Sequence, residues 1–176
     1  MKYYPPKPMY IPDDGDLFKK LDNDRTWIVE PKINGIRAIA FGMELFSRHG
    51  RKILKPLVER AWFSPGSEFD CEYVCKNGVH RLYIFDIMRY DGKDISELPL
   101  IERKKILLKL KIPVVLPWLT DDKIKYYREC IENGYEGVVL KKLDSRYEKF
   151  PTESKEISTW LKVKPKRVSF KGRYVL

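Results

Sequence analysis

Lysines, arginines and carboxylates recur in six short segments that otherwise have the composition of β-strands and their turns. In chain order these are EPKINGIR at residues 30–37, SRHG at 47–50, EFDCE at 68–72, IFD at 84–86, EGVVLK at 136–141 and WLKVK at 160–164. They supply an amine nucleophile, cations to neutralise phosphates, carboxylates for a divalent metal and an aromatic ring for a base. Those are the groups that a phosphoryl-transfer site requires.

The strands that position these groups can be read from β-branched and aromatic runs. Residues 27–31 and 36–41 are two such runs, separated by a turn that contains Gly35, so Lys32 is expected at a strand end. Residues 68–74 and 79–88 predict a hairpin across Asn77 and Gly78, a pair typical of tight hairpin turns. Shorter strands are expected at residues 45–47, 136–142 and 160–164.

Helices are expected between and beside these strands. They are predicted at residues 16–21 with Asp16 as N-cap, at 56–62, at 99–110, and from an N-cap at Thr120 to Asn133 and Gly134. In the third of these, Leu98, Ile101 and Leu108 are predicted to share the buried face. A polar loop is expected over 144–158, and Cys71 and Cys75 are expected in the core. The pattern predicts an α+β domain with mainly antiparallel sheets.

Composition favours one globular domain with a partner of negative charge. The 176 residues are 43% hydrophobic and 34% charged, with a net charge of +10, which excludes disordered, collagen-like and membrane-spanning classes. We therefore expect an intracellular protein, cytoplasmic or viral in a host cytoplasm. The excess charge is concentrated after residue 100, and a basic tail favours a polyanion such as nucleic acid or nucleotide phosphate, while a merely solvated tail remains an open alternative; its cations are Lys166, Arg167, Lys171 and Arg173.

Taken in order, the six segments closely resemble the nucleotidyltransferase domain shared by ATP-dependent polynucleotide ligases and messenger-RNA capping enzymes. The resemblance extends over residues 27–165 and is sharpest towards ATP-dependent DNA ligases, because FDIM at 85–88 is followed by LPLIER at 98–103. It implies an ATP-grasp-like nucleotidyltransferase fold, with antiparallel sheets flanked by helices. Residues 1–26 would form an N-terminal arm and short helix, residues 27–165 the nucleotidyltransferase domain, and residues 166–176 a basic tail.

The resemblance implies that Lys32 attacks the α-phosphate of ATP, expels pyrophosphate and carries AMP as a phosphoramidate. A lysine amine has an ordinary pKa near ~10.4, so burial and nearby cations must lower the pKa of Lys32 for it to react at neutral pH. Lys162, Lys164 and a bound metal are candidates for that effect. Lys162 and Lys164 would also contact the α-phosphate, because alternate residues of a strand share a face. Glu136 would bind Mg²⁺.

The resemblance assigns five further residues to the nucleoside and its phosphate. Glu30 would accept from the adenine amino group, Phe85 would stack on the adenine ring, and Glu72 would accept from a ribose hydroxyl. Arg37 and Arg48 would clamp the ribose and phosphate.

Structural explanations remain open for the same residues. Phe85 is equally a core aromatic, Glu30 and Glu72 are candidates for ion pairs with arginines, and Lys162 and Lys164 suit one face of an edge strand.

Three neighbouring residues are less firmly assigned. For Asp86, a purely structural role in fixing the residues around its strand remains open, and Asp70 has no assigned role. Lys141 can simply face solvent.

Two features depart from the family pattern. Asn34 stands where DNA ligases usually carry aspartate, which leaves open whether DNA or RNA is the substrate. An OB-fold normally follows the last motif, but only about a dozen residues follow Lys164, so no OB-fold is expected within this sequence. A partner chain could supply one, and the protein is otherwise expected to be a monomer that binds no membrane.

These observations predict a minimal ATP-dependent DNA ligase that uses ATP and Mg²⁺ and seals nicked DNA through lysyl-AMP and an adenylylated 5′-phosphate. The alternatives are an RNA ligase, a capping-type nucleotidyltransferase that uses GTP, and a non-catalytic module that binds nucleic-acid ends.

Overall fold

The computed structural model describes residues 3–42, 44–53 and 65–165. The predicted helix at 56–62 and the tail residues Lys166, Arg167, Lys171 and Arg173 lie outside these ranges. The described chain forms, in order, β1 (Lys7–Pro12), α1 (Asp16–Leu21), β2 (Trp27–Lys32), β3 (Ile36–Phe41), β4 (Glu44–Ser47), β5 (Glu68–Lys76), β6 (Val79–Tyr90), β7 (Lys93–Asp94), α2 (Leu100–Lys109), α3 (Lys123–Glu132), β8 (Gly137–Lys142) and β9 (Glu156–Lys164).

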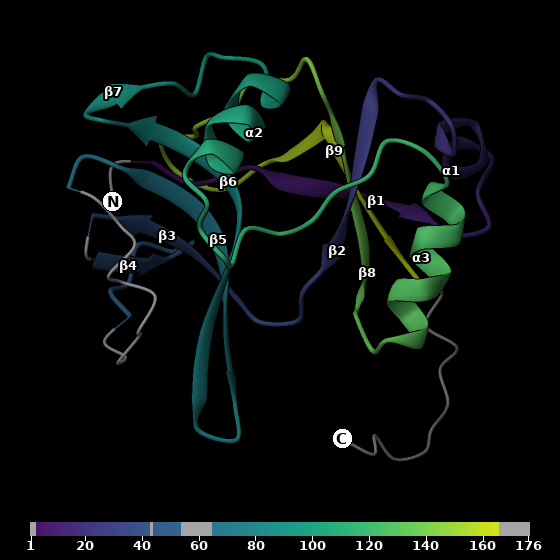
Figure 1. Cartoon of the computed structure of the whole chain (residues 1–176), viewed down its shortest axis with the longest axis horizontal. Helices are drawn as coiled ribbons and strands as arrows, with labels where there is room; N and C mark the ends of the chain where they lie inside the picture. Colours follow the sequence, from purple (N-terminus) through teal and green to yellow (C-terminus); the bar gives the residue numbers. More distant parts are fainter. Residues whose placement is uncertain (1–2, 43, 54–64, 166–176) are drawn as a thin grey trace.

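The strands form two sheets that face each other across the molecule (Figure 1). One has five strands in the order β4-β3-β5-β6-β7, and every neighbouring pair is antiparallel. The other has four strands in the order β1-β9-β8-β2, in which β1 runs parallel to β9 and the other pairs are antiparallel. The chain crosses from the second sheet to the first between β2 and β3. The prediction of an α+β fold with mainly antiparallel sheets is confirmed.

Helices pack against the sheets and complete two apolar cores. Leu107 of α2 packs into the core of the five-stranded sheet, beside Leu82 and Ile84 of β6. Phe18 of α1 and Tyr127 of α3 pack against the four-stranded sheet, with their rings 5.6 Å apart in an edge-to-face arrangement. Within the described ranges, every helix is too short or too polar to cross a bilayer.

The predicted hairpin is confirmed, because β5 and β6 pair antiparallel from Glu68 and Arg89 to Lys76 and Val79. Asn77 and Gly78 have φ values of 51° and 76°, the left-handed conformation that a two-residue turn between twisted strands requires.

The buried face of α2 differs from the prediction. Leu98, just before the helix, and Leu108 are 38% and 57% exposed, whereas Arg103 and Lys104 are fully buried. Apolar spacing misplaced this face because carboxylates in the neighbouring strands bind the two cations, which allows charged side chains to occupy core positions.

Two helix starts were also placed wrongly. Helix α3 begins at Lys123 rather than after Thr120, because the Lys123 ammonium turns back to the carbonyl oxygens of Asp22, Asp24 and Thr120. Asp16 is the first residue of α1, and Gly15 is its N-cap.

The predicted loop and one cysteine also differ. The loop expected over 144–158 gives way to β9 at Glu156, since pairing with β1 extends that strand. Cys71 is buried as expected, but Cys75 is exposed because it lies near the tip of the β5–β6 hairpin.

A buried ion pair fixes α2 to β6. The Arg103 guanidinium donates to both carboxylate oxygens of Asp86, at 2.8 and 2.9 Å, and both side chains are fully buried. Arg103 also donates to the carbonyl oxygens of Leu98 and Ser145. Burial would raise the pKa of Asp86, but Arg103 outweighs burial and lowers that pKa below the usual range. Asp86 therefore holds structure, as the sequence allowed.

We expect Arg103→Met to reduce the free energy of unfolding by about 3–5 kcal/mol, because it leaves Asp86 buried without its partner. Denaturant unfolding at pH 7 measures the change. Lys109→Met is the matched control, since Lys109 is exposed on the last turn of the same helix and should change stability by less than about 0.5 kcal/mol. A loss for Arg103→Met no larger than that of the control would contradict the assignment.

Candidate active site

A cavity of about 500 Å³ opens between the two sheets and collects most of the residues that the sequence singled out. Its lining includes eight of them: Glu30, Lys32, Arg37, Arg48, Glu72, Phe85, Lys162 and Lys164. These residues come from β2, β3, β5, β6 and β9 and from the turn after β4. Glu136 contacts two of the lining lysines. The four tail cations proposed for nucleic-acid binding lie outside the described residues.

Two glycines allow the chain to approach closely around Lys32. A Cβ on Gly35 would lie 2.5 Å from the carbonyl oxygen of Tyr73, so only glycine lets the turn after Lys32 pack against β5. Gly137 has a φ of 144°, and a Cβ there would collide with the backbone of Val163 in β9. Strands β8 and β9 therefore meet closely enough to place Glu136 beside Lys164.

One carboxylate holds two lysine ammonium groups at the end of the cavity. Oε2 of Glu136 contacts Nζ of Lys32, and Oε1 contacts Nζ of Lys164. Burial lowers the pKa of Lys32, and Arg37 lowers it further, whereas the nearby Glu72 opposes the shift. A larger fraction of Lys32 is therefore a neutral amine than for a lysine in water, as a nucleophile requires.

The pKa of Glu72 is also shifted by its surroundings. Burial raises the pKa of Glu72 to about 7, even though Lys32 and Arg37 act in the opposite direction. Its charge therefore changes near neutral pH, close to the proposed nucleophile.

An aromatic wall and a cation form the middle of the cavity. Phe85 and Trp160 meet edge to face, with ring centroids 6.3 Å apart, and the Arg37 guanidinium lies 5.4 and 5.3 Å from the two centroids. Arg37 also donates to both carboxylate oxygens of Asp70 and to the carbonyl oxygen of Pro6. Arg37 is therefore held firmly at the cavity wall, and Asp70 is the group that holds it.

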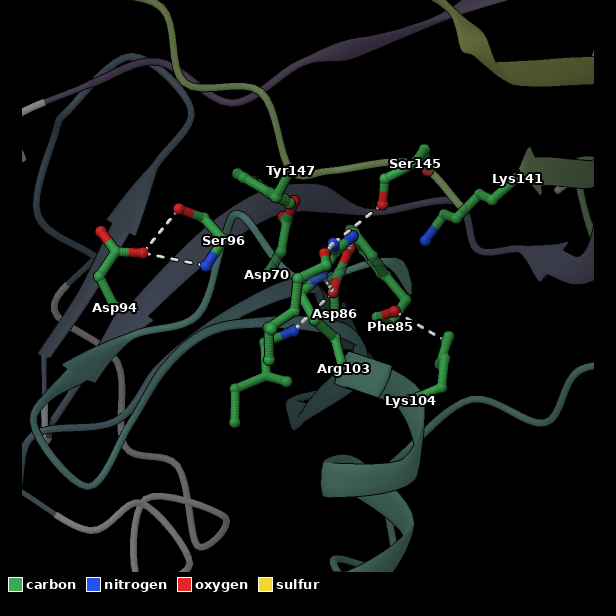
Figure 2. Close-up of polar contacts among 12 residues, drawn as sticks. Asp70, Phe85, Asp86, Asp94, Ser96, Arg103, Lys104, Lys141, Ser145 and Tyr147 are labelled. Carbon is green, nitrogen blue, oxygen red and sulfur yellow. Dashed lines mark hydrogen bonds and ion pairs between the residues drawn. The ribbon is translucent and has the colours of Figure 1, made fainter. Parts of the chain in front are cut away.

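At the opposite end, the cavity contains a buried cluster that sequence reasoning described only in part. Glu30 is 1% exposed and forms ion pairs with Lys104 and Lys141 rather than with the arginines considered from sequence. Lys141, which the sequence allowed to face solvent, is 2% exposed because its ammonium lies between Glu30 and the rings of Phe85 and Trp160. Figure 2 shows Lys104, Lys141 and Phe85 close together.

Sequence reasoning missed two further contributors. Lys7 lines the cavity from β1, a strand outside the resemblance, and nothing in its local sequence distinguished it from a surface lysine. The sequence held one indication for Lys104, because it follows Arg103 in the predicted helix at a position expected to face the sheet.

Two of the predicted residues lie in more open surroundings. Lys162 forms a 3.3 Å ion pair with Glu156, and Arg48 is exposed at the cavity edge.

Glu136 is a suitable partial ligand for Mg²⁺. Its side chain is 28% exposed and lies among cations that suit phosphate groups. Mg²⁺ commonly takes one or two protein carboxylates and completes its shell with water and substrate phosphate. The described residues hold no group of three or more metal-ligating side chains, so a cage made of protein alone is not formed among them. A single carboxylate beside a phosphate site fits a shared ion.

Comparisons with known proteins relate this chain to DNA ligases. Residues 62–164 match the family described as "ATP dependent DNA ligase domain". The chain is 38% identical over 87 residues to a DNA ligase of Methanocorpusculum labreanum, covering 47% of this chain and 15% of that protein. It is 27% identical over 171 residues to the SPbeta prophage-derived DNA ligase-like protein LigB of Bacillus subtilis, covering 80% of this chain and 62% of that protein.

Solved structures share the fold. A mycobacterial DNA ligase D complexed with ATP and MES has a TM-score of 0.71 at 22% identity, covering 92% of this chain and 60% of that one. A Chlorella virus DNA ligase-adenylate has a TM-score of 0.62 at 18% identity, covering 90% and 67%. The chain therefore spans less than two thirds of both curated relatives and of the mycobacterial structure. The family match extends over more than half of the chain, from the approach to β5 through β9, so this protein belongs to the ATP-dependent DNA ligase domain family.

Proposed function

We propose that this protein catalyses ATP-dependent DNA ligation through a covalent AMP intermediate on Lys32. The observation that carries the proposal is the position of Lys32, which is partly buried, has a lowered pKa, lines a cavity large enough for a nucleotide and contacts Glu136. The family relationship supports ATP as the nucleotide and DNA as the polynucleotide.

In the first step, the neutral amine of Lys32 attacks the α-phosphorus of ATP. A phosphorus–nitrogen bond forms, the bond to the bridging oxygen of the β-phosphate breaks, and pyrophosphate leaves. The attacking nitrogen gives up one proton to solvent water, which leaves a neutral phosphoramidate N–H. Lys162 and Lys164 would neutralise the α-phosphate, and Arg37 and Arg48 would hold the ribose and phosphate.

The other end of the cavity would bind the nucleoside. Phe85 would stack on adenine, Glu30 would accept from its amino group, and Glu72 would accept from a ribose hydroxyl. Glu136 would hold Mg²⁺, which supplies positive charge to the phosphates when bound. This arrangement places the base and the reacting phosphate at opposite ends of one pocket.

The later steps would transfer AMP to a DNA 5′-phosphate and then seal the nick. The 5′-phosphate oxygen attacks the phosphorus of lysyl-AMP and releases Lys32, and the 3′-hydroxyl then attacks the 5′-phosphorus and releases AMP. An archaeal ATP-dependent RNA ligase shares the fold, with a TM-score of 0.57, and Asn34 also leaves RNA open. The substrate experiment below therefore includes both polynucleotides.

Incubation with α-labelled ATP and Mg²⁺ should place acid-labile label on the wild-type protein and none on Lys32→Ala. Denaturing electrophoresis measures the label, and a chase with nicked DNA or nicked RNA identifies the acceptor. We expect loss of label from the protein and sealing of nicked DNA. Lys142→Ala is the control, because Lys142 is ion-paired with Asp144 outside the cavity lining.

Equal labelling of the wild type and Lys32→Ala would contradict the assigned nucleophile. Preferential transfer to nicked RNA would reassign the substrate, and label from GTP rather than ATP would point to capping chemistry.

The labelling rate at saturating ATP should rise with pH as Lys32 loses its proton, with a midpoint below the ordinary lysine pKa. Ionised Glu72 raises the pKa of Lys32, so Glu72→Gln should move this midpoint to lower pH. Glu44→Gln is the control, since Glu44 is an exposed carboxylate paired with Lys52. A midpoint that moves upward, or that stays fixed in Glu72→Gln, would contradict this electrostatic coupling.

A further inference from the structure

The base end of the cavity contains more buried positive charge than its carboxylate can balance. Glu30, Lys104 and Lys141 are 1%, 0% and 2% exposed. Lys104 donates to Oε1 of Glu30 and, at 2.8 Å, to the carbonyl oxygen of Phe85. Nζ of Lys141 lies 2.7 Å from Oε2 of Glu30. Asp86 is already bound by Arg103, so the cluster keeps one surplus cation.

The two lysines differ in what they can reach. Lys141 lines the cavity, and its ammonium makes an ion pair with Oε2 of Glu30. Lys104 of α2 has no exposed surface; its ammonium contacts Glu30 and the carbonyl oxygen of Phe85, and Figure 2 shows the second contact. Lys141 therefore borders the cavity, whereas Lys104 does not line it and acts only through the groups that it holds.

We propose that Lys104 is a positioning residue for nucleotide selection: it fixes Glu30 as a hydrogen-bond acceptor and so favours a purine with an amino group at position 6 over one with an oxygen there. The inference deepens the proposed function and rests on its assignment of the base end.

The selectivity follows from the hydrogen-bonding capacity of each group. An ammonium group only donates, so Lys104 requires Glu30 to be the ionised, acceptor-only carboxylate. An ionised carboxylate accepts from the 6-amino group of adenine and repels the 6-oxygen of hypoxanthine. Without Lys104, Glu30 would either turn fully towards Lys141 or take up a proton and become a donor. Either change removes the distinction between the two bases.

Equilibrium binding of AMP and IMP tests the proposal separately from catalysis, because neither ligand carries a pyrophosphate leaving group. Isothermal titration calorimetry should show that the wild type prefers AMP. Lys104→Met should weaken AMP binding by roughly tenfold or more and bring the AMP-to-IMP affinity ratio close to one. Lys105→Met is the matched control, because Lys105 is the next residue, exposed and paired with Glu102, and its ratio should stay at the wild-type value.

Kinetics and rescue separate positioning from a merely structural role. In labelling with ATP, Lys104→Met should raise KM and leave kcat nearly unchanged, and Lys104→Arg should restore most of the AMP preference because it keeps a buried donor cation. A change in melting temperature with an unchanged AMP-to-IMP ratio and KM would overturn the proposal.

If Lys104→Met does not fold, Glu30→Gln and the double variant Glu30→Gln/Lys104→Met carry the test, since the double variant leaves no carboxylate facing a missing partner. With Glu30 already neutral, removal of Lys104 should not alter the AMP-to-IMP ratio further. A further change in the double variant would overturn the proposal. A wild type that prefers AMP but acquires no label on Lys32 would instead contradict the proposed function and leave this inference standing.

Discussion

Buried ion pairs link strands of both sheets to one another and to α2. Asp86 and Arg103 join β6 to α2, and Asp70 and Arg37 join β5 to β3. Glu30 of β2 reaches α2 through Lys104 and β8 through Lys141. Burying these charges costs free energy that their partners must offset. The ion pairs therefore fix the sheets and α2 relative to one another.

The same constraint explains the arrangement of the cavity. In the proposed function its two ends would meet opposite chemical demands, because a base needs specific donors and acceptors whereas a triphosphate needs mobile positive charge. At the end proposed for the base, the cluster around Glu30 is closed to solvent. At the other end, Glu136 keeps the like charges of Lys32 and Lys164 close together while remaining partly exposed, so an incoming phosphate can compete for both lysines. The buried cluster around Glu30 and the exchangeable ion pairs of Glu136 thus lie in different parts of one cavity.

Local sequence was sufficient for the parts of the fold that depend on local rules. The Asn77 and Gly78 turn and the glycine-containing turn after Lys32 each follow from backbone preferences, and the order of the six segments brought the cavity residues together correctly. The buried face of α2 was misjudged because an apolar pattern cannot show that Arg103 and Lys104 find carboxylates from distant strands. Lys7 escaped notice for a similar reason, since only its pairing with residues near 156 brings it to the cavity.

The place of β9 in its sheet has a consequence for how the protein folds. This strand is late in the sequence yet lies between β1 and β8, and it pairs in parallel with the first strand of the chain. Such pairing has a high contact order, which slows folding and ties early residues to late ones. Until residues 156–164 have left the ribosome, β1 and β8 have no common partner, and the strand that carries Lys164 is missing from the sheet of Lys32. Lys32 and Lys164 can therefore meet only after β9 has been synthesised.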